Sequence, residues 1–131
     1  MDRVFLDANV LVSAALTPES RLHELWRRPT VKLTGSPYVM AEARRNVDDP
    51  AAAARLEQLI AVMAVLPAEP ADFEISGDPQ LPPKDRPVLL AAIASGSDYL
   101  LTGDAAHFGT LFGHAYGGVT VLRPGEYLHR S

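Results

Sequence analysis

The chain has 131 residues and no cysteine, which suits one domain covering residues 1–131 and excludes disulfides and thiolate metal ligands. Its 12 basic and 16 acidic residues give a net charge of -4, which argues against nucleic-acid binding driven by bulk charge alone. No apolar stretch reaches the roughly 20 residues of a membrane span and no signal peptide is recognisable, so we expect a soluble, cytoplasmic protein without a membrane partner.

Strands and helices are predicted to alternate in the first half of the chain. Short apolar runs predict buried strands, and apolar residues that recur at helical spacing predict helices. A serine cap, or a proline at the first helical position, marks the beginning of several of these helices. In chain order, we expect a strand at 4–6, a helix after Asp7, a helix at 20–26, a strand at 31–34, and helices that begin at Ser36 and at Pro50, the latter reaching residue 64.

The same alternation resumes in the second half, after a proline-rich connection. Strands that alternate with helices predict an α/β fold with a mainly parallel sheet and helices on both of its faces. In chain order, we expect a strand within 62–66, an irregular segment at 68–83 with a short helix at 72–75, a helix at 86–94 capped by Asp85, strands at 98–102 and 119–122, and a helical turn at 124–128.

Four carboxylates stand where these elements would aim them at one place. Asp7 and Asp104 each follow a predicted strand, and the carboxyl ends of parallel strands meet at one edge of a sheet. Glu42, in an unusually apolar helical turn, and Asp85 would reach this edge from helices. Grouped carboxylates repel one another unless a cation compensates, and Mg²⁺ and Mn²⁺ prefer oxygen ligands. Taken singly, each acid also fits a helix cap, a turn or a solvated surface. Their joint placement predicts a metal site, and without them 12 acids face 12 bases.

Several polar residues flank the four acids in sequence. Asn9 lies two residues after Asp7, and Thr102 lies two residues before Asp104, so both are predicted to orient a carboxylate or a water molecule. His107 lies three residues after Asp104, and we expect it to support the structure or contact a substrate, because hard cations prefer oxygen to nitrogen. The basic residues that flank the acids could meet phosphates or be solvated surface charges; they are Lys84, Arg86 and Arg44.

Four parts of the sequence together resemble the PIN-domain ribonucleases, and in particular the small toxins of toxin–antitoxin pairs. They are Val-Phe-Leu-Asp-Ala-Asn-Val at 4–10, the helix acid Glu42, Lys-Asp-Arg-Pro-Val-Leu-Leu-Ala-Ala at 84–92, and Asp-Tyr-Leu-Leu-Thr-Gly-Asp at 98–104. No one of these strings is specific, but their order and spacing extend over nearly the whole chain. The sequence departs from the pattern at His107, where many relatives carry another acid before the aromatic residue.

The resemblance implies a three-layer α/β/α sandwich with a central, mainly parallel sheet of four or five strands. It implies that Asp7, Asp85 and Asp104, with Glu42 as the helix carboxylate, are catalytic and bind Mg²⁺ or Mn²⁺ to hydrolyse phosphodiester bonds in RNA. It also implies a cognate antitoxin protein and a possible homodimer. Candidate antitoxin contacts on the first two helices are Leu22, Leu25 and Trp26.

Two alternatives belong to other classes of protein. One is a catalytically silent PIN-like module that binds RNA or a protein partner, which the retention of all four acids disfavours. The other is a receiver-like domain that accepts a phosphoryl group on an aspartate. Such domains place two acids together near the first strand, whereas here Asp2 precedes that strand and Asp7 stands alone at its end.

Overall fold

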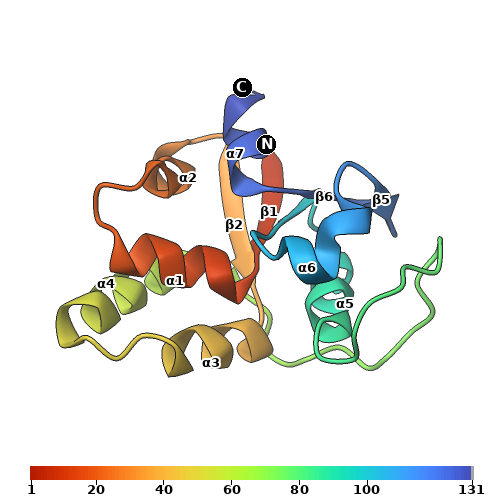
Figure 1. Ribbon diagram of the computed structural model, residues 1–131, viewed down its shortest axis with the longest axis horizontal. Helices are drawn as coiled ribbons and strands as arrows, with labels where there is room; N and C mark the ends of the chain where they lie inside the picture. The colour runs from red at the N-terminus through yellow and green to blue at the C-terminus, as the bar shows by residue number, and fades with distance from the viewer. Residues whose placement is uncertain (131) are drawn as a thin grey trace.

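The computed structural model describes residues 1–130 and is built around a six-stranded sheet with the strand order β3-β2-β1-β4-β6-β5 (Figure 1). All neighbouring strands pair in parallel except β5 and β6, which are antiparallel. The strands are β1 (Asp2–Leu6), β2 (Val31–Gly35), β3 (Ala64–Val65), β4 (Tyr99–Leu101), β5 (Ala115–Tyr116) and β6 (Val119–Leu122).

Helices connect the parallel strands. Proline occupies the first turn of four of them, where its missing N–H costs no hydrogen bond. No helix among the described residues has the length and apolarity needed to cross a membrane. The helices are α1 (Ala8–Leu16), α2 (Glu24–Arg27), α3 (Pro37–Arg45), α4 (Pro50–Ala61), α5 (Arg86–Ala94), α6 (Ala105–Phe108) and α7 (Pro124–His129), with 3₁₀ turns at Arg21–His23 and Gly109–Leu111.

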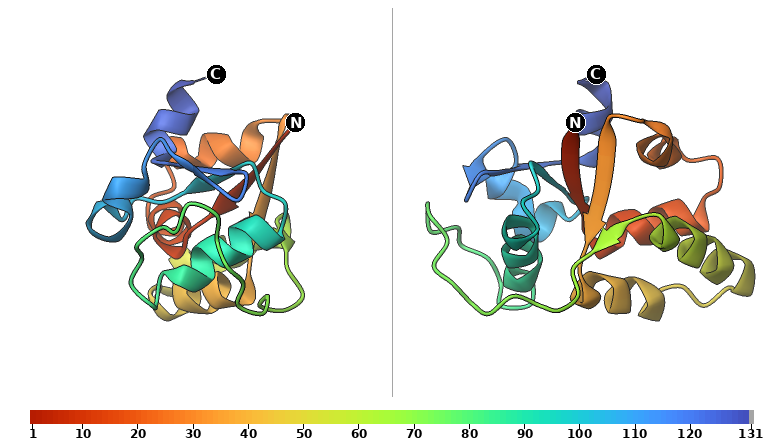
Figure 2. Two further views of the ribbon diagram at one scale, coloured as in Figure 1. Left: turned by 90° about the vertical axis from the view of Figure 1, so that its right-hand side faces the viewer. Right: turned by 180° about the vertical axis from the view of Figure 1, so that it is seen from behind.

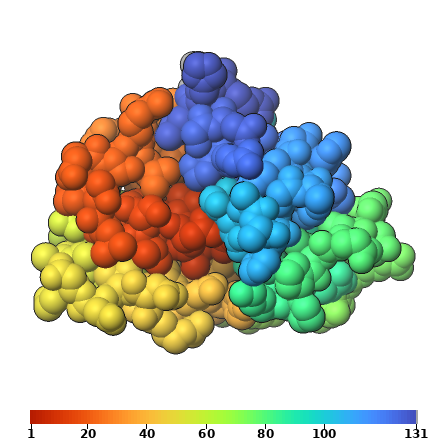
Figure 3. Space-filling model, in the orientation of Figure 1, coloured from red at the N-terminus to blue at the C-terminus, as the bar shows by residue number. Residues whose placement is uncertain are grey.

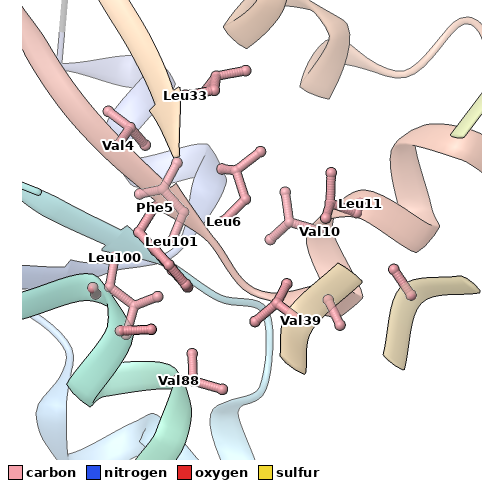
Figure 4. Packing of buried hydrophobic residues seen from close by; sticks show 14 of the residues in the cluster. Val4, Phe5, Leu6, Val10, Leu11, Leu33, Val39, Val88, Leu100 and Leu101 are labelled. Carbon is pink, nitrogen blue, oxygen red and sulfur yellow. The ribbon is translucent and has the colours of Figure 1, made fainter. Parts of the chain in front are cut away.

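The sheet is covered on both faces. Val4, Phe5 and Leu6 of β1 are all fully buried, although successive side chains of a strand point to opposite faces. Helices α1, α3 and α4 pack against one another, while α5 packs against β2 and β4. Figure 4 shows the apolar side chains that meet between β1 and these neighbouring elements. The predicted α/β/α architecture is therefore confirmed.

The register of the two central strands determines where the first polar residues emerge. Leu6 of β1 pairs with Leu101 of β4, and the backbone N–H of Asp7 donates to the Leu101 carbonyl over 3.0 Å. Asp7 and Thr102 therefore leave the sheet side by side. At the opposite end, the start of β1 lies beside α7 (Figure 1), and the Tyr127 hydroxyl donates to Asp2 Oδ2 over 2.7 Å.

The prediction of four or five strands was too low because it missed β5, which pairs with the predicted strand β6 in a hairpin. Gly117 and Gly118 form its turn, with φ angles of 56° and 85° that favour glycine. The adjacent glycines signal such a turn, but a two-residue strand is too short for its alternation to be recognised.

Three other predicted elements differ from the structure. Residues 72–75 form no helix, and the segment 66–85 is an irregular connection with turns that loops out beside α5 (Figure 2). Helix α4 ends at Ala61 instead of reaching residue 64, and the strand expected within 62–66 is only Ala64–Val65. The helical turn α6 was not expected, because four residues are too few to show a helical period.

Candidate metal centre

A cavity of about 440 Å³ lies at the carboxyl ends of β1 and β4, and all four predicted acids line it. The elements that carry them, α1, α3, α5 and α6, meet on the face of the molecule seen in Figure 3. The four acids, which are distant in sequence, thus meet at the carboxyl ends of the strands, as the sequence predicted. The lining residues are Asp7, Ala8, Asn9, Val12, Ser13, Glu42, Asn46, Lys84, Asp85 and Asp104.

Asp7 is buried and held by three hydrogen bonds. Its Oδ1 accepts from the backbone N–H of Ala8 over 2.8 Å, which caps α1 as its position predicted. Its Oδ2 accepts from the Thr102 hydroxyl over 2.9 Å and from Asn9 Nδ2 over 3.1 Å. The carboxylate is therefore fixed in orientation from both neighbouring segments.

Asn9 and Thr102 also connect the ends of β1 and β4. Asn9 Nδ2 lies 3.1 Å from Thr102 Oγ1, and Asn9 Oδ1 accepts from the backbone N–H of Gly103 over 2.8 Å. Thr102 Oγ1 in turn accepts from the backbone N–H of Asp104 over 3.1 Å. These contacts make Asn9 and Thr102 part of one network that positions Asp7 and Asp104.

Asp85 was expected to cap α5 with its side chain, but it does not. It occupies the N-cap position of α5, but its side chain accepts no hydrogen bond from the helix backbone. Its Oδ2 instead faces the ring of His107, 2.9 Å from Nδ1, which also lies 2.8 Å from Asp104 Oδ2. Neither contact has the direction of a hydrogen bond, so Asp85 Oδ2 and His107 Nδ1 are buried without a hydrogen-bond partner among residues 1–130.

Burial and the neighbouring carboxylates raise the pKa of two of the acids, Asp7 and Asp85. Desolvation, opposed by the hydrogen bonds from Thr102 and Ala8, raises the pKa of Asp7 from 3.8 to about 6. Desolvation also raises the pKa of Asp85, more than the nearby charges of His107 and Lys84 lower it. A cation in this cavity would relieve both costs.

Glu42 and Lys84 also line the cavity and come from two different segments of the chain. Glu42 is half-buried on α3, and Lys84 is exposed immediately before Asp85. Tyr38 lies one helical turn before Glu42, and its hydroxyl donates to the Lys84 carbonyl over 2.6 Å. Burial, followed by the charges of Glu42 and Asp85, raises the pKa of this phenol. Tyr38 thereby ties α3 to the segment that carries Asp85.

The two predicted phosphate-binding arginines lie outside the cavity and have other partners. Arg44 forms a two-pronged pair with Glu57, with both N···O distances 2.9 Å, and both side chains are about half exposed. Arg86 donates to Asp72 Oδ1 over 2.9 Å and to the Phe73 carbonyl over 2.6 Å. Their contact with a substrate stays a prediction, whereas Lys84 is placed beside the acids.

The sequence did not single out two polar residues that also line the cavity. Ser13 lies four residues after Asn9 on α1, and Asn46 lies four residues after Glu42. Because residues four apart share one face of a helix, this spacing could have identified both.

The grouping of possible metal ligands differs from the predicted quartet. Among residues 1–130, the one group of three ligand atoms close enough to share an ion, all within 4.8 Å of one another, comes from Asp85, Asp104 and His107. Asp7 and Glu42 line the same cavity but are not in this group. The unpartnered oxygen of Asp85 and the surrounding carboxylates fit a divalent cation, which prefers oxygen ligands.

Comparison with known families agrees with this architecture. The pattern of the PIN domain matches residues 3–106, well over half of the chain. The chain therefore belongs to the PIN-domain family. A search of curated protein sequences found no match.

Solved structures with a similar fold include three from bacteria. VapBC2 from Rickettsia felis, bound to a DNA fragment from its promoter, gives a TM-score of 0.67 at 14% identity, covering 92% of this chain and 98% of that chain. VapBC-1 from nontypeable Haemophilus influenzae gives 0.59 at 14% identity, covering 94% and 98%. VapC20 from Mycobacterium tuberculosis, a sarcin–ricin loop cleaving toxin, gives 0.53 at 18% identity, covering 79% and 92%. At these identities the likeness shows the fold.

Proposed function

We propose that this protein is a divalent-metal-dependent endoribonuclease that hydrolyses RNA phosphodiester bonds. The observation that carries the proposal is the cavity at the strand ends, where four acids gather and Asp85 Oδ2 is buried without a hydrogen-bond partner. Membership of the PIN-domain family supports a nuclease, and VapC20 is a solved relative described as cleaving the sarcin–ricin loop.

The residues of the cavity divide between binding and positioning. Asp85 and Asp104 would hold Mg²⁺ or Mn²⁺, and Asp7 and Glu42 would supply the other two carboxylates that line the cavity. When bound, such an ion polarises the scissile phosphate and lowers the pKa of an attacking water molecule.

The neighbouring polar groups suit this task. Thr102 and Asn9 keep the Asp7 carboxylate pointed in one direction, as a preorganised site requires. Glu42, half-buried at the cavity, is placed to orient a water molecule. Lys84 is exposed at the edge of the cavity, where its ammonium group can contact a neighbouring phosphate of the RNA.

The attacking group gives a direct test of this chemistry. A mixed RNA pool incubated with purified protein and Mn²⁺ should be cut, and EDTA should abolish cutting. Attack by water leaves no 2′,3′-cyclic phosphate, and a 2′-deoxy nucleotide at the cut position should still be cleaved. Cyclic phosphate products would show that the 2′-hydroxyl attacks in place of water, and cleavage that persists in EDTA would show that no metal is needed. Either result would overturn the proposal.

We further propose that the protein is the toxin of a toxin–antitoxin pair. Two of the solved structures with this fold are VapBC assemblies. Of the predicted antitoxin contacts, Leu25 is only 1% exposed and belongs to the core, while Leu22 and Trp26 are partly buried against it. Any partner on this face would therefore contact the edges of Leu22 and Trp26.

Growth of the native host tests the toxin proposal. Expression of the protein should arrest growth, and coexpression of the product of an adjacent small reading frame should restore it. An Asp85→Asn variant should be harmless. Normal growth on expression of the wild-type protein would count against a toxin and would leave the ribonuclease proposal to the cleavage test.

A further inference from the structure

His107 stands between two acids that the four-acid prediction treated as sufficient. Its Nδ1 lies 2.9 Å from Asp85 Oδ2 and 2.8 Å from Asp104 Oδ2. The backbone around His107 is fixed by its neighbours on both sides in sequence. The backbone N–H of His107 donates to Asp104 Oδ1 over 3.2 Å, and the next residue, Phe108, is fully buried. Three potential ligand atoms therefore converge on one point from two segments.

The contacts among these three atoms are not hydrogen bonds. Asp85 is only 8% exposed, yet its Oδ2 and His107 Nδ1 both lack a hydrogen-bond partner among the described residues. A buried polar atom without a partner costs free energy, so such a pair needs an explanation. A cation bound by all three side chains supplies one.

The spacing of the atoms suits such a cation. Neighbouring ligands of an octahedral ion at 2.0–2.1 Å lie about 3 Å apart. The two observed N···O distances, 2.9 and 2.8 Å, need to grow by only a few tenths of an ångström. His107 Nδ1 is therefore already placed to share one ion with each of the two oxygens, and all three atoms lie within 4.8 Å of one another.

We propose that His107 is a nitrogen ligand of the metal centre and makes the site select Mn²⁺ over Mg²⁺. An imidazole nitrogen binds transition-metal ions better than Mg²⁺, which prefers oxygen ligands and retains its water. This inference rests on the metal site of the proposed function but is independent of RNA cleavage. It differs from the expectation that His107 only supports the structure or contacts a substrate.

Electron spin echo spectroscopy of the Mn²⁺-loaded protein tests the bond itself. The wild-type spectrum should show ¹⁴N modulation from a directly bound nitrogen, and wild-type protein labelled with ¹⁵N-histidine should lose this pattern without any mutation. His107→Asn should also lose it. A matched control is His114→Asn, which changes an exposed histidine outside the cavity and should keep the pattern.

Calorimetry with each metal alone tests the selectivity. In His107→Asp, which restores an all-oxygen ligand set, the ratio of the Mg²⁺ and Mn²⁺ dissociation constants should fall by at least about tenfold. Absence of ¹⁴N modulation in the wild type, or its persistence after ¹⁵N-histidine labelling, would overturn the proposal. Because neither readout involves RNA, a protein that binds Mn²⁺ through nitrogen but cuts nothing would contradict only the proposed ribonuclease.

Discussion

The hydroxyl of Thr102 donates a 2.9 Å hydrogen bond to Oδ2 of Asp7, a residue 95 positions earlier in the chain. The two residues emerge side by side from adjacent parallel strands, so the bond joins the ends of β1 and β4 at the mouth of the cavity. The same hydroxyl accepts from the Asp104 N–H, which links three parts of the site through one atom.

Replacement of Thr102 by valine should destabilise the protein, because the shape is kept while the carboxylate and the Asp104 N–H lose a partner. We expect a loss of about 1–3 kcal/mol in the free energy of unfolding, measured by urea denaturation in EDTA. Thr120→Val on β6 is the matched control, since Thr120 is only half-buried and lies outside the cavity. Equal losses in the two variants would argue against a special role for Thr102.

The raised pKa of Asp7 predicts an unusual dependence of stability on pH. Its pKa is 3.8 in the unfolded reference and about 6 in the folded protein, so between these values the folded state holds more protons. The metal-free protein should therefore lose about 3 kcal/mol of unfolding free energy from Asp7 as the pH rises from about 4 to 6 and above.

Comparison with Asp7→Asn isolates this contribution, since other acids titrate in the same range. The unfolding free energy of the wild type minus that of the variant, measured in EDTA at each pH, should fall as the pH rises. A difference that is flat with pH would show that burial does not perturb Asp7 in this way.

Asp85→Asn should change stability in opposite directions with and without metal. Because burial raises the pKa of Asp85, its ionised form is unfavourable in the empty cavity, and the neutral amide should raise the melting temperature in EDTA. Mn²⁺ at 100 times its dissociation constant should raise the wild-type melting temperature by roughly 10 °C and the variant far less. Equal metal-induced shifts in the two proteins would remove Asp85 from the site.

Lys84 and Arg44 make a matched pair for RNA binding, because both were predicted to meet phosphates but only Lys84 lines the cavity. In EDTA, Lys84→Ala should weaken binding of a fluorescent RNA and reduce the slope of log affinity against log salt by about one. Arg44→Ala breaks an exposed pair with Glu57 and should leave the slope unchanged. The reverse result would place the RNA along α3.

Sequence patterns located the acids better than they described their surroundings. Asp7 and Asp104 were predictable as neighbours because each ends a strand, and the parallel register then brings Asn9 and Thr102 together. The convergence of Glu42 and Asp85 on the same cavity also followed from helix placement. These features depend on chain direction and hydrophobic pattern, which a single sequence contains.

Side-chain direction and short elements were not accessible in the same way. Asp85 has the position of a cap but turns its carboxylate toward His107, which α6 brings to within 2.9 Å of Asp85 Oδ2. Helix α6 has four residues, too few for a periodic signal, so the contact of His107 with both Asp85 and Asp104 could not be foreseen. The partners of Arg86 lie in the irregular segment 66–85, whose course no local pattern determines.

The central claim is that the acidic cavity binds the metal that cuts RNA, and cleavage by matched acid variants tests it most directly. With Mn²⁺, we predict that Asp85→Asn and Asp104→Asn each lose at least about 100-fold in cleavage rate. Asp48→Asn, an exposed acid outside the cavity, should cut like the wild type. Wild-type rates in both cavity variants would contradict the account.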